Sequence, residues 1–144
     1  MENSINISIL IPLIPMGMAL LILILLVSFN RTINRLTKPV SALAVFSLLS
    51  SALISAFLYL KKIEGEVFLS YYLKLFESTN LVLHLNSLTE KIEIFFTVTI
   101  SIVIGLLFYK LPRQKGYVSL IIGISLISSS IMFAVLFLDL SVLI

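Results

Sequence analysis

The sequence contains no cysteine and no tryptophan, and it has a single histidine. The absence of cysteine excludes disulfides, thiolate metal sites, iron–sulfur ligation and a cysteine nucleophile. His84 alone does not make a metal or haem site. No phosphate loop, dinucleotide motif or catalytic triad is present in the sequence. We therefore expect no catalytic, cofactor-binding or metal-binding residue, and no cofactor, in this chain.

Charge is also scarce. Only 12% of the 144 residues are charged, whereas 60% are hydrophobic, and the mean hydropathy is +1.18. Soluble domains average about 25% charged residues. A water-soluble fold of this length has too little interior to hide so much apolar surface, so we expect a single membrane domain over 1–144. The net charge of +3 lies in short loops between apolar runs, so it does not indicate a nucleic-acid partner.

Four apolar runs are long enough to cross the hydrocarbon as helices, which takes roughly 20 residues each. The predicted fold is therefore an all-α integral membrane protein with spans at about 9–29, 40–60, 91–109 and 117–138. The first span lacks the positive flank of a signal peptide and is predicted to be retained. Pro15 is expected to kink or restart this helix. Thr37 is the candidate N-cap of the second helix, and Ser87 or Thr89 that of the third.

The loop charges predict the orientation. Two short connections carry only positive charges: Arg31, Arg35 and Lys38 in the first, and Lys110, Arg113 and Lys115 in the second. The positive-inside rule places both connections in the cytoplasm. The N- and C-termini and the connection 61–90, whose charges are mixed, are then extracytoplasmic.

The connection 61–90 is too apolar for a solvated linker. The stretch "EVFLSYYLKLFES" predicts an interfacial amphipathic helix or a strand pair on the outer surface. In "TNLVLHLNSLT" the alternate positions are leucines, which is the period of a short strand. We therefore expect this loop to be partly structured.

Small residues recur every four positions in three of the spans. They are Ser47, Ser51 and Ser55 in the second, Thr97, Ser101 and Gly105 in the third, and Ser125 and Ser129 in the fourth. This spacing places each set on one helix face. Small residues let helices approach closely in lipid, so packing within the four-helix unit is the favoured interpretation. Docking onto larger partner subunits is the second, and a polar conduit the third.

Charged residues deep inside a span are the usual mark of ion or proton transport. Here Glu90, Lys91 and Glu93 stand at the start of the third span, and Asp139 stands at the end of the fourth. We interpret all four as interfacial residues at helix ends. The interiors of the spans carry no charge, which argues against a self-contained pump or channel.

The stretch "LIPLIPMGMALLILILLVSFNRTINRL" resembles the N-terminus of the chain 5 subunit of the proton-pumping NADH/plastoquinone dehydrogenase, the complex I type, above all in its cyanobacterial and chloroplast form. "NLVLHLNSLT", an apolar helix and then "GYVSLIIGISLISSSIMFAVLF" extend the resemblance over nearly the whole chain. In this family the N-terminus lies away from the cytoplasm. Two positions depart from the family pattern: Leu83 stands where the family usually has aspartate, and Asn86 where it has serine. The family's proton-translocating residues would lie beyond Ile144, so the resemblance implies a truncated chain 5.

The resemblance implies a non-catalytic accessory or scaffold subunit of a dehydrogenase complex linked to electron transport and proton translocation. It also implies a thylakoid or plasma membrane of a bacterium, with membrane lipid and other membrane subunits as partners. Enzymatic activity would belong to the complex and not to this chain by itself. The alternatives are a stand-alone structural or interaction protein that forms a homo-oligomer, a partner of a small transporter such as one for inorganic carbon, half of a split chain 5 subunit, and a remnant without function.

Overall fold

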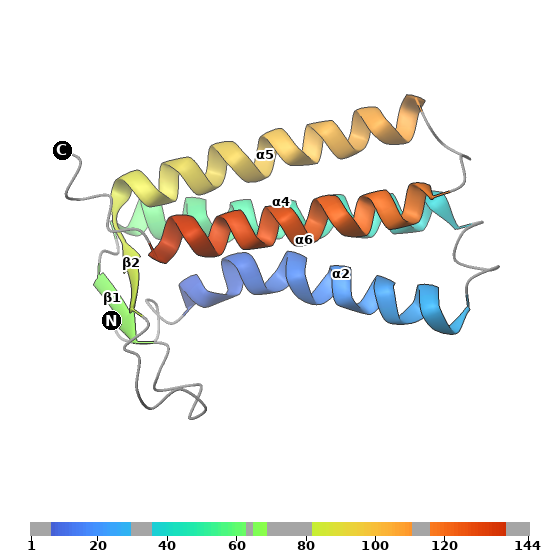
Figure 1. Cartoon of the computed structure of the whole chain (residues 1–144). Helices are drawn as coiled ribbons and strands as arrows, with labels where there is room; N and C mark the ends of the chain where they lie inside the picture. The colour runs from blue at the N-terminus through green and yellow to red at the C-terminus, as the bar shows by residue number, and fades with distance from the viewer. Residues whose placement is uncertain (1–6, 30–35, 63–64, 69–81, 111–115, 138–144) are drawn as a thin grey trace.

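The computed structural model describes residues 7–29, 36–62, 65–68, 82–110 and 116–137. Within these residues, four long helices form a bundle, and a short two-stranded sheet lies at one end of it (Figure 1). The helices are α2 (Leu10–Ser28), which follows the 3-10 turn η1 (Ile7–Ile9), α4 (Thr37–Lys61), α5 (Ser87–Lys110) and α6 (Tyr117–Phe137). Each is long and apolar enough to cross a membrane. The protein is therefore an all-α integral membrane protein, as the sequence predicts.

Helix α2 continues through Pro15 and does not restart there. Proline has no backbone N–H, so within a helix it leaves the carbonyl four residues earlier without its usual donor. In α2 that carbonyl belongs to Ile11. Of the two predicted effects the restart is absent, and a kink stays a prediction. The position of Pro15 creates a local demand for a hydrogen-bond donor from another helix.

Helix α4 begins earlier than predicted. Thr37 is its first helical residue, whereas the N-cap position belongs to Leu36, which makes no side-chain cap hydrogen bond. The prediction of Thr37 as the N-cap is therefore wrong. At the other end Lys62 adopts the left-handed conformation with a φ of 50°. That conformation terminates the helix, as is common at helix C-termini.

Helix α5 also begins earlier than predicted, because Asn86 caps it. The side-chain oxygen Oδ1 of Asn86 accepts hydrogen bonds from the backbone N–H groups of Leu88 at 3.1 Å and Thr89 at 2.8 Å. The hydroxyl of Thr89 accepts in return from the backbone N–H of Asn86 at 3.0 Å. This reciprocal pair resembles a capping box. Neither Ser87 nor Thr89 is thus the N-cap, although Thr89 contributes to the cap.

The connection between α4 and α5 contains a strand pair. Strand β1 (Gly65–Phe68) is antiparallel to β2 (Val82–Leu85), with Gly65 opposite Leu85 and Phe68 opposite Val82. The predicted short strand is confirmed at 82–85, and its partner β1 includes the first residues of the stretch for which a helix or a strand pair was predicted. The remainder of the apolar stretch, 69–81, lies outside the described residues.

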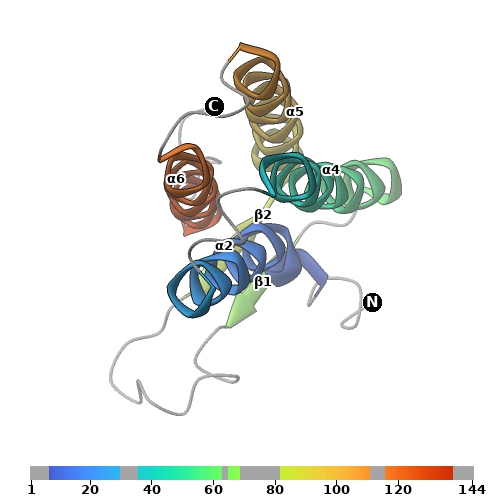
Figure 2. The same cartoon turned by 90° about the vertical axis from the view of Figure 1, so that its right-hand side faces the viewer.

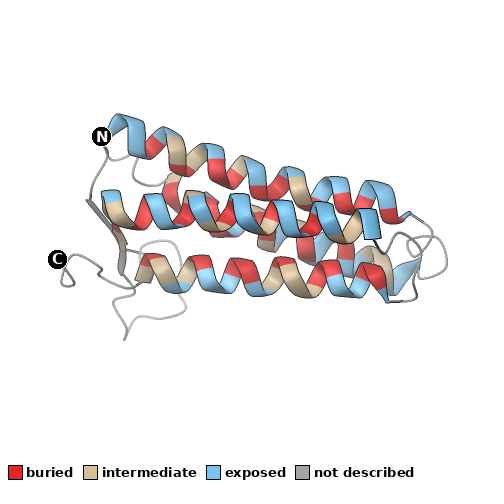
Figure 3. Cartoon of the chain, turned by 90° about the horizontal axis from the view of Figure 1, so that it is seen from above, coloured by how far each residue is buried: buried red, intermediate tan, exposed pale blue. Residues whose placement is uncertain are grey.

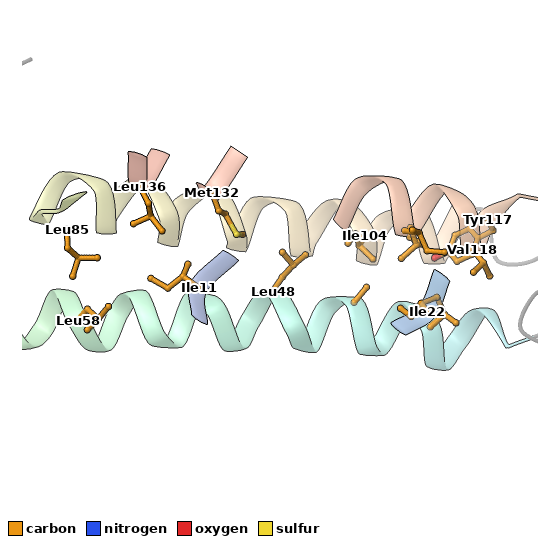
Figure 4. Close-up of a cluster of buried hydrophobic side chains, with 14 residues drawn as sticks. Ile11, Ile22, Leu48, Leu58, Leu85, Ile104, Tyr117, Val118, Met132 and Leu136 are labelled. Atoms are coloured by element: carbon orange, nitrogen blue, oxygen red, sulfur yellow. The ribbon is translucent and has the colours of Figure 1, made fainter. Parts of the chain in front are cut away.

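Helix α4 lies between α2 and α5, and α6 packs mainly against α2 (Figure 2). Helix α5 is the outermost of the four and packs mainly against α4. Buried positions form stripes along the inward helix faces, while exposed positions lie outward (Figure 3). The centre of the bundle holds apolar side chains that include Ile11, Leu48, Met132 and Leu136 (Figure 4).

Two of the six residues that predict the orientation are described by the structure. Lys38 stands in the first turn of α4 and Lys110 ends α5, and both are exposed. The two positions lie at one end of the bundle, opposite the sheet (Figure 1). The other four, Arg31, Arg35, Arg113 and Lys115, lie outside the described residues.

Candidate functional site

Small polar side chains lie in rows on the buried faces of α4 and α5. Ser51 and Ser55 of α4 are fully buried, as is Thr97 of α5, while Ser47 and Ser101 are nearly so. The two helices pack closely and run antiparallel. We call these five residues, together with Glu93 of α5, the polar seam. It runs through the membrane-spanning part of the bundle.

Most hydroxyls of the polar seam bond to their own helix. Ser47 donates to the carbonyl of Ala44 at 2.8 Å. Thr97 donates to the carbonyl of Glu93 at 2.8 Å, and Ser101 donates to that of Thr97 at 2.7 Å. No water is present in the hydrocarbon to satisfy a hydroxyl, so a buried serine or threonine must find a carbonyl within the protein. Because these hydroxyls are already hydrogen-bonded within their own helix, the small side chains can pack against another helix without leaving a polar group unsatisfied.

Two serines instead bond to α2 beside its proline. The Ser51 hydroxyl lies 2.7 Å from the carbonyl oxygen of Ile11 and 3.1 Å from that of Ser47, so its single hydrogen is shared between the two, with the shorter contact to Ile11. Ser129 of α6 donates to the carbonyl of the neighbouring Pro12 at 2.8 Å. Helices α4 and α6 therefore both attach to α2 at the turn that Pro15 disturbs. These contacts connect three of the four helices.

A further polar contact joins α4 to α6 at the opposite end of the bundle from the sheet. The Ser41 hydroxyl lies 2.7 Å from the hydroxyl of Tyr117, and it donates to the carbonyl of Thr37 at 2.8 Å. Ser41 has one hydroxyl hydrogen, so Tyr117 must donate to Ser41 when that hydrogen is on Thr37. Both side chains are buried. The pair fixes the start of α4 against the start of α6.

The remaining predicted packing residues differ among themselves. Ser125 is buried, and its hydroxyl has no hydrogen-bond partner. Gly105 is exposed, and a Cβ at that position would meet nothing within 4 Å. Ile104 is fully buried in its place. The face of α5 that packs inward therefore continues from Ser101 to Ile104 and not to Gly105.

The sequence analysis missed the burial of two glutamates. Glu90 and Glu93 do lie near the start of α5, but each is only 1% exposed. They are in the same row as Thr97, Ser101 and Ile104, at spacings of three or four residues. That spacing defines one helix face, so the sequence carried the signal. The two carboxyl groups therefore face the protein interior.

A groove lies between α2 and α6. Its volume is about 390 Å³, and it is lined mostly by apolar side chains, among them Met16, Leu126, Phe133 and Phe137, with Ser129 and Ser130 as the polar ones. No groups of three or more histidine, aspartate or glutamate residues able to hold a metal ion occur among the described residues.

Comparison with protein-family models, curated proteins and solved structures found no match to this chain.

Proposed function

We propose that the chain is a non-catalytic helical component of a larger membrane complex, in which it acts as an accessory or scaffold subunit. The observation that carries this proposal is the position of α5. This helix packs mainly against α4, and its outward face presents Phe95, Ile102 and Leu106, which are 76%, 58% and 56% exposed. A neighbouring subunit that packs on this face would complete the burial of α5.

The inward and outward faces of the helices support this division of roles. The small hydroxyl residues are used inside the bundle, where they hold α2, α4 and α6 together. The outward faces carry large apolar side chains, as lipid or an apolar subunit surface requires. A subunit would therefore contact this chain through large apolar residues of α5 and not through the serine rows.

The resemblance of the sequence to chain 5 suggests which complex this is. We propose a dehydrogenase of the NADH/plastoquinone type in a bacterial thylakoid or plasma membrane. The positive-inside rule would place the end with Lys38 and Lys110 in the cytoplasm and the sheet on the other side. The electron-transfer chemistry would then belong to other subunits of the complex.

Co-purification tests this proposal. Native membranes are extracted in mild detergent and separated on a native gel, and the band that contains the chain is analysed by mass spectrometry. Dehydrogenase subunits in near-equal amounts are the expected result. Recovery of the chain only as a small homo-oligomer would overturn the proposal and favour a stand-alone interaction protein.

The docking face is tested by crosslinking. Because the natural chain has no cysteine, an introduced cysteine is its only thiol. We expect a thiol-linked photocrosslinker on Ile102→Cys of α5 to capture a subunit of the complex. The matched control is Val27→Cys of α2, which is also highly exposed and should capture mainly lipid. Equal capture at both positions would remove the assignment of α5 as the docking helix.

A further inference from the structure

Glu93 is a buried carboxyl group without a hydrogen-bond partner among the residues that the structure describes. Its side chain is 1% exposed, and neither Oε1 nor Oε2 has a hydrogen-bond partner. An ionised carboxylate in such a place is strongly unfavourable unless a positive charge neutralises it. Some positive species must therefore accompany Glu93 when the bundle is closed.

The position of Glu93 along α5 increases this demand. It lies six positions after Ser87 (93 − 87), so it stands about 9 Å from the start of the helix. The 24-residue helix is about 36 Å long, against about 30 Å for the hydrocarbon. If the helix is centred in the bilayer, Glu93 lies inside the hydrocarbon boundary. Bulk water at the interface does not solvate it there.

Two serine hydroxyls lie at about the same height along the bundle axis as Glu93. The hydrogen bond between Ser51 and Ile11 fixes α4 against α2. One turn closer to the sheet, α4 carries Ser55 and the chain before α2 carries Ser8. Both serines are fully buried, and within the described part of the chain neither hydroxyl has a hydrogen-bond partner. Ser55 therefore differs from Ser47 and Ser51, which bond to backbone carbonyls.

Glu93 and Ser55 lie at about the same height along the bundle axis because α4 and α5 pack antiparallel. Ser55 lies six positions before Lys61 (61 − 55), and Glu93 lies six positions after Ser87, at the same end of the bundle. The Lys91 ammonium, 5.4 Å from the centre of the Tyr59 ring, joins the two helices at that end. The buried face of α5 thus brings a carboxyl group to the level of the two hydroxyls.

The described ionisable groups at this end of the bundle come from α5, α4 and the two strands. Helix α5 contributes Glu90 and Lys91, α4 with its C-cap contributes Tyr59, Lys61 and Lys62, and the sheet contributes Glu66 of β1 and His84 of β2. The described parts of η1 and α2 contribute none, and the only one of α6, Tyr117, lies at the far end.

The ammonium groups of two lysines at this end of the bundle lie over aromatic rings and not beside Glu93. Lys91 and Lys61 are exposed, and their ammonium groups lie over the rings of Tyr59 and Phe57. Neither neutralises Glu93, whose oxygens have no partner.

We propose that Glu93, with Ser55 and Ser8, forms a buried binding site for a monovalent cation, either a proton or Na⁺. A carboxylate with two hydroxyls offers the oxygen ligands that hard cations prefer. One carboxylate without a partner carries one negative charge, which matches a single positive charge. At 1% exposure the site admits a small ion and excludes a lysine or arginine of another protein.

Carbodiimide labelling tests the site with the full-length chain in lipid nanodiscs. A hydrophobic carbodiimide adds to protonated carboxyl groups in apolar surroundings, and the modified peptide is identified by mass spectrometry. We expect labelling at Glu93 that rises at least tenfold as the pH is lowered if a proton is the ligand. If Na⁺ is the ligand, we expect added NaCl to protect Glu93, whereas choline chloride at equal ionic strength should not.

Glu93→Gln is the matched variant, because it keeps the shape and removes the charge. It should lose the labelling at position 93, and its thermal midpoint should no longer depend on pH or Na⁺. Infrared difference spectra of the natural chain should show the carbonyl band of a protonated carboxylic acid that Glu93→Gln lacks in the proton case. Labelling that responds to neither pH nor Na⁺, together with a natural-chain midpoint that does not respond either, would overturn the proposal.

Discussion

The Ser51 hydroxyl donates a 2.7 Å hydrogen bond to the carbonyl of Ile11, the backbone oxygen that Pro15 deprives of its helical donor. A proline inside a membrane helix is tolerated when a side chain from a neighbour satisfies the freed carbonyl. Here the neighbour is α4. The sequence feature that would weaken α2 alone therefore becomes a specific attachment point between two helices.

We expect Ser51→Ala to lower the free energy of unfolding by about 1–2 kcal/mol, because it leaves the Ile11 carbonyl unsatisfied in an apolar environment. Ser47→Ala is the matched control, since its hydroxyl bonds only within α4, and its effect should stay within about 0.5 kcal/mol. Pulse proteolysis in mixtures of SDS and mild detergent measures both values.

A double-mutant cycle separates this account from loss of packing. Pro15→Ala restores a backbone N–H for the Ile11 carbonyl, so Ser51→Ala should cost clearly less in that background than in the natural chain. Equal costs in the two backgrounds would show that Ser51 acts through its volume and not through the freed carbonyl.

The contact between Ser41 and Tyr117 predicts an asymmetry between two substitutions. Tyr117→Phe leaves Ser41 bonded to the carbonyl of Thr37, so we expect a cost of about 0.5–1 kcal/mol. Ser41→Ala leaves the buried Tyr117 hydroxyl without its partner and should cost about 1–2 kcal/mol. The same proteolysis assay compares them, and a larger cost for Tyr117→Phe would contradict the hydrogen-bond assignment.

The start of α5 depends on the side chain of Asn86. We expect Asn86→Ala to cost about 1 kcal/mol, because the backbone N–H groups of Leu88 and Thr89 lose their acceptor. Asn86→Asp retains an acceptor at the same place and should cost only a few tenths of a kcal/mol. Faster hydrogen exchange at those two amides in Asn86→Ala alone would verify the cap, and unchanged exchange would refute it.

The sequence was sufficient to predict the fold class because four apolar runs of membrane length permit few other structures. The strand at 82–85 was also predictable from its alternation. The N-cap of α5 was not, because a serine, a threonine and an asparagine stand close together, and only the backbone geometry selects Asn86.

The four-residue spacing predicted which residues face inward only for two or three successive positions of each row. Four-residue steps advance about 400° around an α-helix, so a row with this spacing turns off its face by about 40° a step. Gly105 and Tyr59 continue the two rows in sequence but are exposed, whereas Ile104 and Leu58 take the buried positions. Glu93 lies four residues before Thr97, so the four-residue spacing already included it in this row. Its charge made burial at that position unexpected.

The orientation predicted by the loop charges is measurable because the natural chain has no cysteine. Lys38→Cys and Lys110→Cys stand at exposed positions of one end of the bundle, and Lys62→Cys stands at an exposed position of the other. We expect a membrane-impermeant maleimide to label Lys62→Cys on intact cells, and Lys38→Cys and Lys110→Cys only after the membrane is made permeable. If the dominant pool is in thylakoids, sealed vesicles of known sidedness replace intact cells. Labelling of Lys38→Cys and Lys110→Cys from opposite sides would contradict the helical bundle itself, whereas a uniform reversal would contradict only the orientation derived from the positive charges.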